Sequence, residues 1–150
     1  MTTYHRAEDV STELKTRLAT LTVAQGAETD LGRVVYLGKR VPDKSMVPCA
    51  VLLEGDDDPE RQGNTTTYKV TRRFILMAYV TCDPDNPNVA AHAALRDMKR
   101  AVFGDGGRMG DKVRTVTYVG TAIGPRADGE NFVLALLEVD VEYVESLSSP

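Results

Sequence analysis

The chain has 150 residues, of which 42% are hydrophobic and 27% are charged, and its formal net charge is −4. A chain of this length can bury roughly 68–70% of the surface that it exposes when unfolded, so it needs no metal or disulfide to fold. No apolar run approaches the ~20 residues of a membrane-spanning helix, and the two cysteines are too few for a disulfide scaffold. The acidic balance argues against nucleic acid as the main partner. We therefore expect one soluble, cytoplasmic domain over residues 1–150.

The net charge conceals an asymmetry along the chain. Residues 127–150 contain six acidic residues and no lysine or arginine, whereas residues 1–126 carry 18 basic and 16 acidic residues. The chain thus has a weakly basic body and an acidic final segment.

The first half of the chain predicts one helix and three strands. Apolar residues recur every three or four positions over about 7–21, the pattern of an amphipathic helix. The β-branched and aromatic run 33–37 predicts a short strand, and the apolar run 49–53 predicts a strand covered on both sides. Residues 68–81 predict the longest strand, with a polar first half and an apolar second half. The acidic and threonine-rich segment 55–67 predicts a solvated loop.

The proline-rich segment 83–87 ends the preceding strand and begins a second helix. Pro87 suits the first helical position, with the side chain of Asn86 as the cap that accepts the free amide hydrogen bonds. The helix is expected to run to about Phe103 and to stop at Gly104. The glycine-rich segment 104–110 predicts a flexible connector, because a phosphate-binding glycine loop would follow a strand and open a helix.

Two strands close the chain, at 113–123 and 132–144, with a turn at 126–129. The order α-β-β-β-α-β-β predicts an α+β fold, a mainly antiparallel or mixed sheet with both helices packed on one face. The last strand alternates, with apolar residues on one face and three acidic residues on the other, namely Glu138, Asp140 and Glu142.

Asp83, Asp85 and His92 are the strongest candidates for enzymatic chemistry. A general base needs a positioned partner, and neither histidine has a neighbouring acid or nucleophile in the sequence. The spacing also lacks the cysteine pairs of a zinc site and the closing glutamate of a calcium loop. The sequence therefore predicts no catalytic, cofactor-binding or metal-binding residue and places His92 on an exposed helix face. A small enzyme or ligand-binding domain that uses these three residues stays the alternative.

The acidic row on the last strand is by default a solvated strand face, and contact between subunits is a second, more informative interpretation. Like charges on one strand face repel each other unless solvent or a basic surface screens them. Identical subunits that meet head to tail could place this row against the basic end of strand 68–81 of a neighbour. The candidate subunit contacts are Lys69, Arg72, Arg73, Glu138, Asp140 and Glu142.

Several segments together point to a known family. The opening helix leads to Gly26-Ala27-Glu28-Thr29-Asp30-Leu31-Gly32 and a short strand, and Pro48 precedes a buried strand. Cys82-Asp83-Pro84-Asp85-Asn86-Pro87-Asn88 opens an alanine-rich helix that leaves through Asp97-Met98-Lys99-Arg100-Ala101-Val102-Phe103-Gly104. Together with the closing hydrophobic and acidic strand, this pattern resembles the tail terminator (tail completion) proteins of long-tailed bacteriophages and prophages over nearly the full chain.

The resemblance implies a structural protein without a cofactor, found in the virion tail and in the host cytoplasm during assembly. Such a protein forms a ring, commonly a hexamer, on the end of the tail tube, stops tube polymerisation and offers a surface for joining the head. Its partners would be further copies of itself, the tail tube protein and a head-completion protein, with no nucleic acid and no membrane. Another neck or minor tail component, or a non-viral binding module, stays an alternative. The candidate residues for contact with another tail component are Asp56, Asp57, Asp58, Glu60 and Arg61.

Overall fold

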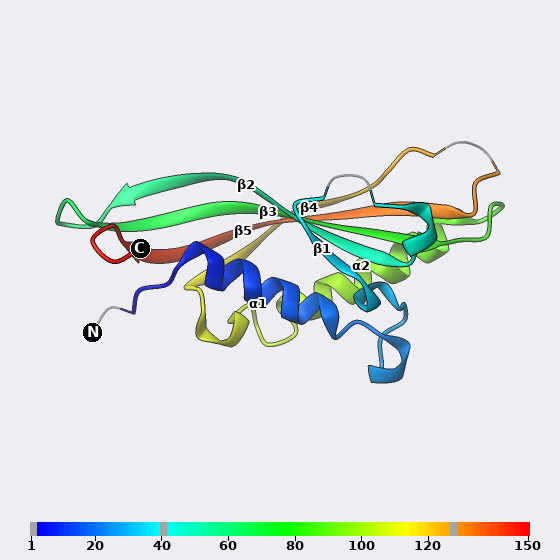
Figure 1. Cartoon of the computed structure of the whole chain (residues 1–150), viewed down its shortest axis with the longest axis horizontal. Helices are drawn as coiled ribbons and strands as arrows, with labels where there is room; N and C mark the ends of the chain where they lie inside the picture. The colour runs from blue at the N-terminus through cyan, green and yellow to red at the C-terminus, as the bar shows by residue number, and fades with distance from the viewer. Residues whose placement is uncertain (1–2, 40–41, 127–128) are drawn as a thin grey trace.

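The computed structural model describes residues 3–39, 42–126 and 129–150. It contains two helices and a five-stranded mixed sheet in a single α+β domain, which confirms the predicted fold class and element order (Figure 1). The elements are α1 (Ala7–Ala19), β1 (Val35–Leu37), β2 (Cys49–Arg61), β3 (Thr67–Thr81), α2 (Pro87–Phe103), β4 (Thr115–Ile123) and β5 (Phe132–Ser146). No helix in these described ranges is long and apolar enough to cross a membrane.

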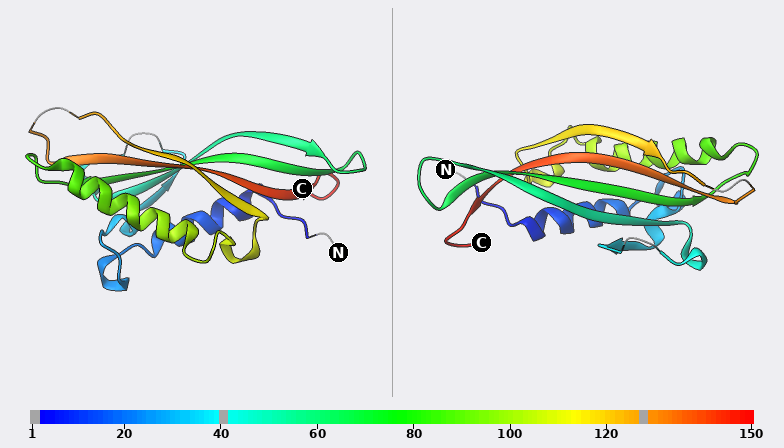
Figure 2. Two further views of the ribbon diagram at one scale, coloured as in Figure 1. Left: turned by 180° about the vertical axis from the view of Figure 1, so that it is seen from behind. Right: turned by 90° about the horizontal axis from the view of Figure 1, so that it is seen from above.

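The strands lie in the order β1-β2-β3-β5-β4. The short strand β1 pairs with β2 in parallel, and the other three pairings are antiparallel. Strands β3 and β5 lie side by side along their whole length, from the pair Thr67 and Ser146 to the pair Thr81 and Phe132. Figure 2 shows the consequence, a long twisted sheet with β1 and the outer half of β2 on one edge and β4 on the opposite edge.

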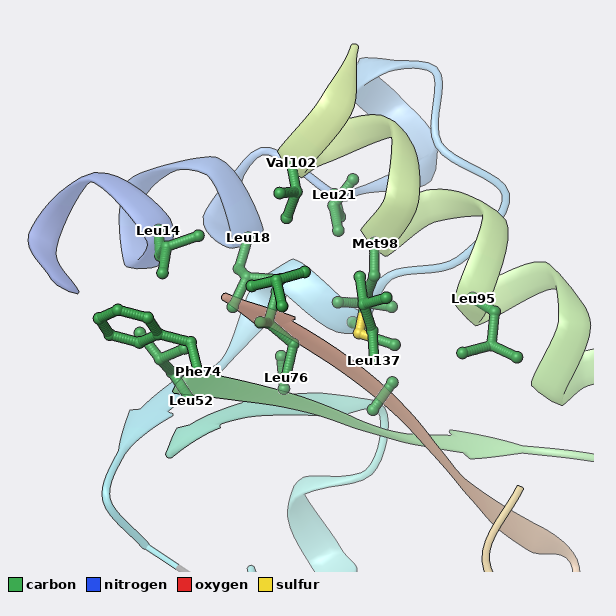
Figure 3. Close-up of a cluster of buried hydrophobic side chains, with 14 of the residues drawn as sticks. Leu14, Leu18, Leu21, Leu52, Phe74, Leu76, Leu95, Met98, Val102 and Leu137 are labelled. Atoms are coloured by element: carbon green, nitrogen blue, oxygen red, sulfur yellow. The ribbon is translucent and has the colours of Figure 1, made fainter. Parts of the chain in front are cut away.

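Both helices cover the same face of the sheet, as predicted (Figures 1 and 3). The apolar stripe of α1 packs with that of α2 over the inward side chains of β2, β3 and β5. The alternation of β5 decides which of its side chains enter the core. Every second residue from Val133 to Tyr143 is buried, whereas Glu138, Asp140 and Glu142 face the other side. The side chains at the centre of this core are Leu14, Leu18, Leu52, Phe74, Leu76, Met98, Val102 and Leu137.

The second helix begins and ends close to the predicted residues, but its cap differs. Pro87 occupies the first turn, and the helix ends at Phe103 with Gly104 after it. The predicted cap bond of Asn86 is wrong, because its side chain accepts no hydrogen bond from the helix. The backbone of Asn86 has φ −140° and ψ 60°, which is outside the extended conformation that usually aims a cap side chain at the first turn.

The predicted loop at 55–67 is wrong for most of its length. Strand β2 continues to Arg61, and only residues 62–66 form the turn into β3. A bulge between Glu54 and Asp57 shifts the register, after which Asp57 pairs with Arg72 and Glu60 pairs with Lys69. The acidic composition suggested a loop, but the strand has one neighbour and an open edge, so its charged side chains stay in water.

The second half of this hairpin and the end of β5 form a three-stranded projection, which we call the distal arm and define as residues 54–61, 67–73 and 140–146. Figure 1 shows the arm extending past the N-terminal end of α1. The polar first half of β3 lies in it, as the sequence predicted. The amide of His5 donates to the carbonyl oxygen of Val144 at 2.8 Å and ties the N-terminal segment to the arm.

The segment between α1 and β1 is held by a buried carboxylate. Asp97 on α2 is fully buried and accepts hydrogen bonds from the amides of Glu28 and Thr29 at 3.0 and 2.8 Å and from the Thr29 hydroxyl at 2.7 Å. Arg96 adds an ion pair to Glu28 at 2.8 Å. The backbone of Gly32 packs directly against the end of α1.

The connector after α2 is anchored rather than flexible. Asp105 accepts a hydrogen bond from Arg17 of α1 at 2.8 Å and also accepts one from the amide of Arg108 at 3.1 Å. The Arg17 hydrogen bond lowers the pKa of Asp105 to about 2. Met109, in the short helical turn that follows, is fully buried in the core. In the predicted turn at 126–129, Ala127 and Asp128 lie outside the described residues.

Candidate assembly surface

Two of the three acidic residues in the row of β5 pair with an arginine of β3 in the same chain. Arg73 lies opposite Asp140 in the strand register, and its Nε donates to Asp140 at 2.7 Å. Its Nη1 donates to Glu138 at 3.3 Å. These hydrogen bonds, above all the one that Asp140 accepts, raise the pKa of the Arg73 guanidinium. The repulsion along the row is therefore relieved inside the subunit.

The remaining basic residues of β3 pair with β2. Arg72 lies 3.3 Å from Asp57, donates to the Gly55 carbonyl at 3.1 Å and donates to the Tyr143 hydroxyl at 3.4 Å. Burial raises the pKa of the Tyr143 phenol. Lys69 lies 3.1 Å from Glu60, directly across the hairpin. These pairs follow the strand register, so they hold the arm strands in one alignment.

The structure thus brings together all six residues that the sequence selected as subunit contacts. They lie on the adjacent strands β3 and β5, and each has an oppositely charged neighbour in its own chain. The neighbour of Glu142 is Arg114, at 3.7 Å. A contact between subunits through these residues stays a prediction. No local pattern in the sequence indicated Arg114 or the pairing inside the chain, because the register of three strands decides which charges lie opposite each other.

The residues selected for contact with another tail component lie on the open edge of the sheet. Asp56, Asp57, Asp58, Glu60 and Arg61 are all exposed on the outer half of β2. Asp57 and Glu60 are paired across the hairpin. Within the described part of the chain, Asp56 and Asp58 form no ion pair. Their role toward another protein stays a prediction.

The alternative site does not form a catalytic arrangement. His92 is exposed, as predicted for the polar face of α2, and Asp83 accepts a hydrogen bond from the amide of Asp85 in a tight turn. An open hollow of about 600 Å³ lies near the start of α2, and Asp83 is the one carboxylate among its described lining residues, which do not include His92. Among the residues that the structure describes, no three His, Cys, Asp or Glu side chains gather as metal ligands would.

Comparisons with known proteins give a similarity of fold. No family model matches the chain, and no curated protein matches it. Among solved structures, the chain is similar to a chain of the structure described as "Virion of native gene transfer agent (GTA) particle". The TM-score is 0.55 and the sequence identity is 16%, and the similarity covers 90% of this chain and 97% of that chain. The two chains therefore share one fold over almost their whole lengths.

Proposed function

We propose that this protein is a structural component of a phage-like virion, and specifically a tail terminator. The observation that carries the proposal is the shared fold with a chain of a gene transfer agent particle, which extends over 90% of this chain and 97% of the other. Fold alone does not determine function, so the proposal also rests on the family resemblance of the sequence segments described above.

The surface of the molecule supports a role in assembly more than a role in catalysis. The distal arm extends the sheet beyond the helices (Figure 1) and presents charged side chains rather than a cavity. The hollow near α2 is open, and it does not gather the residues of a nucleophile, base and anion-binding group. A function in contacts with other proteins fits both features.

In the proposed mechanism, six copies form a ring on the end of the tail tube, prevent further tube subunits from adding and present the opposite surface to a head-completion protein. Reversing the charges of the acidic row with the triple variant Glu138→Lys, Asp140→Lys and Glu142→Lys is expected to disturb the ring. The same change removes the partners of Arg73, so the stability of the monomer is measured on the same variant.

The proposal is tested by adding the purified protein to tube protein during polymerisation. Electron microscopy measures the tube lengths and the density at the tube ends. We expect shorter tubes with a ring at one end. Tubes that keep their length and bare ends would contradict the terminator function, and binding elsewhere on the virion would instead indicate another neck or minor tail component.

A further inference from the structure

The two long edges of the sheet are chemically different. On one edge, β2 is paired with β1 only at residues 50–52, so within the described residues its outer half, 53–61, has an open side. On the opposite edge, β4 is the last strand over residues 115–123. Figure 2 shows these two edges on opposite sides of the molecule. A neighbouring copy placed beside the sheet therefore meets one edge with the other.

The outer half of β2 is an acidic edge. It carries five acidic residues and one arginine, and all of these side chains are exposed. Lys69 and Arg72 neutralise two of the acids, whereas Asp56 and Asp58 have no ion pair in the described part of the chain. The edge therefore keeps unpaired negative charge, and its bulge and Pro59 prevent regular strand addition.

The start of β4 is a basic corner. Arg108, Lys112 and Arg114 precede the strand and are exposed, together with one acidic residue, Asp111. Arg114 lies 3.7 Å from Glu142, and Arg108 and Lys112 form no ion pair among the described residues. In the described part of the chain, the outer half of β2 thus keeps three acidic residues and one arginine without an ion pair, whereas the start of β4 keeps two basic residues and one acidic residue without one. The two edges therefore carry unpaired charge of opposite sign.

Strand β4 has no protecting charge for an edge strand, and a bulge between Tyr118 and Gly120 interrupts its pairing with β5. Its nine residues include no charged residue and no proline, and Tyr118 and Val119 are 48% and 40% exposed. Soluble proteins usually protect an exposed edge strand with charge, proline or cover by another segment. An uncharged, exposed strand next to a basic corner is a surface that a partner with an acidic rim can cover.

We propose that the occupant is a second copy of this chain, whose acidic β2 edge lies along β4 with Asp56 and Asp58 facing Arg108 and Lys112. The contact joins two different surfaces of the subunit, so it is heterologous, and repetition closes a ring when the rotation between copies allows it. This inference rests on the proposed ring function and names the surfaces that would build the ring. It assigns Asp56 and Asp58 to the neighbouring copy instead of another tail component.

Two charge-reversed variants test the contact. The first is Asp56→Lys with Asp58→Lys, which makes both edges basic, and the second is Arg108→Glu with Lys112→Glu, which makes both edges acidic. Native mass spectrometry and electron microscopy measure assembly alone and on tail tubes. Each variant alone is expected to self-associate about tenfold or more weakly than the wild type, because like charges now meet. An equimolar mixture is expected to restore assembly with alternating subunits.

A matched control changes the same number of charges elsewhere. Asp83→Lys with Asp85→Lys reverses two exposed acids near the start of α2 and is expected to assemble like the wild type. Circular dichroism checks that every variant is folded. If both edge variants assembled like the wild type, this contact would be overturned and the ring function would stand. The same conclusion would follow if the Asp56 and Asp58 variant formed normal rings that only failed to bind tubes. A wild type that stays monomeric both alone and on tubes would overturn both proposals.

Discussion

The buried carboxylate of Asp97 is expected to be a major source of stability, and its removal gives a direct test of the packing described above. Asp97 is 0% exposed and accepts three hydrogen bonds of 2.7–3.0 Å from Glu28 and Thr29. It therefore fastens the segment between α1 and β1 to the middle of α2. In Asp97→Ala these three donors lose their acceptor at once, and so does Arg100, which donates to Asp97 at the longer distance of 3.4 Å.

The size of the effect follows from these contacts. A hydrogen bond to a charged group contributes about 1.5–3 kcal/mol, which sets an upper limit of roughly 4.5–9 kcal/mol for three bonds. Thr29 is half-buried and Glu28 is exposed, so water can reach the freed donors, and the variant no longer buries a carboxylate. We expect Asp97→Ala to lower the free energy of unfolding by about 2–4 kcal/mol. Asp97→Asn keeps one acceptor oxygen and is expected to lose about half as much.

Urea unfolding followed by circular dichroism measures this loss. The matched control is Asp85→Asn, an exposed aspartate just before the same helix, which is expected to stay within about 0.5 kcal/mol of the wild type. If Asp97→Ala were as stable as this control, the reasoning that the carboxylate clamps the segment would be refuted.

Three further changes test the core, the close backbone contact and the anchored connector. Leu137→Ala removes a fully buried side chain and should lower the free energy of unfolding by about 2–5 kcal/mol, whereas Leu147→Ala, at an exposed position, should change it by less than about 0.5 kcal/mol. Gly32→Ala places a methyl group against the backbone of α1 and should destabilise by about 1–3 kcal/mol; Gly120→Ala, with no atom within 4 Å, is its control, and equal stability of the two would contradict the close packing. The pKa of Asp105 is about 2 in the folded protein, below its ordinary value of 3.8. The ionised carboxylate therefore contributes fully to the free energy of unfolding above about pH 4, and this contribution disappears as the pH falls through about 2. The stability difference between wild type and Asp105→Asn, no more than about 1 kcal/mol because solvent screens the pair, should therefore vanish in acid urea titrations, and a constant difference would argue against the ion pair.

The arm ion pairs change the meaning of the charge asymmetry in the sequence. The acidic end of the chain lies against basic residues of β3, so much of its charge is neutralised within the subunit. The described residues that form no ion pair include Asp56 and Asp58 on one sheet edge and Arg108 and Lys112 near the other. The sheet edges thus add a second candidate contact between copies to the one predicted for the acidic row.

The local sequence determined those elements whose apolar and polar residues recur most regularly. The period of the apolar residues located α1. A proline at the start and an alanine-rich apolar face located α2 from Pro87 to Phe103. The strict alternation of β5 separated its buried side from Glu138, Asp140 and Glu142. These signals depend only on neighbours in the chain, so they can be read without a fold. The same patterns, in their order, also predicted the α+β class.

Only the tertiary structure decided the extent of β2, the partners of the charged residues and the anchoring of the connector. Residues 54–61 have a loop-like composition, and they form a strand because β3 offers backbone partners on both sides of the bulge and matching cations. Asp97 and Asp105 find their donors 68 and 88 residues away in the chain, at Thr29 and Arg17. Composition and periodicity are local quantities, whereas pairing across strands and helices depends on register and packing that form only when the whole chain folds.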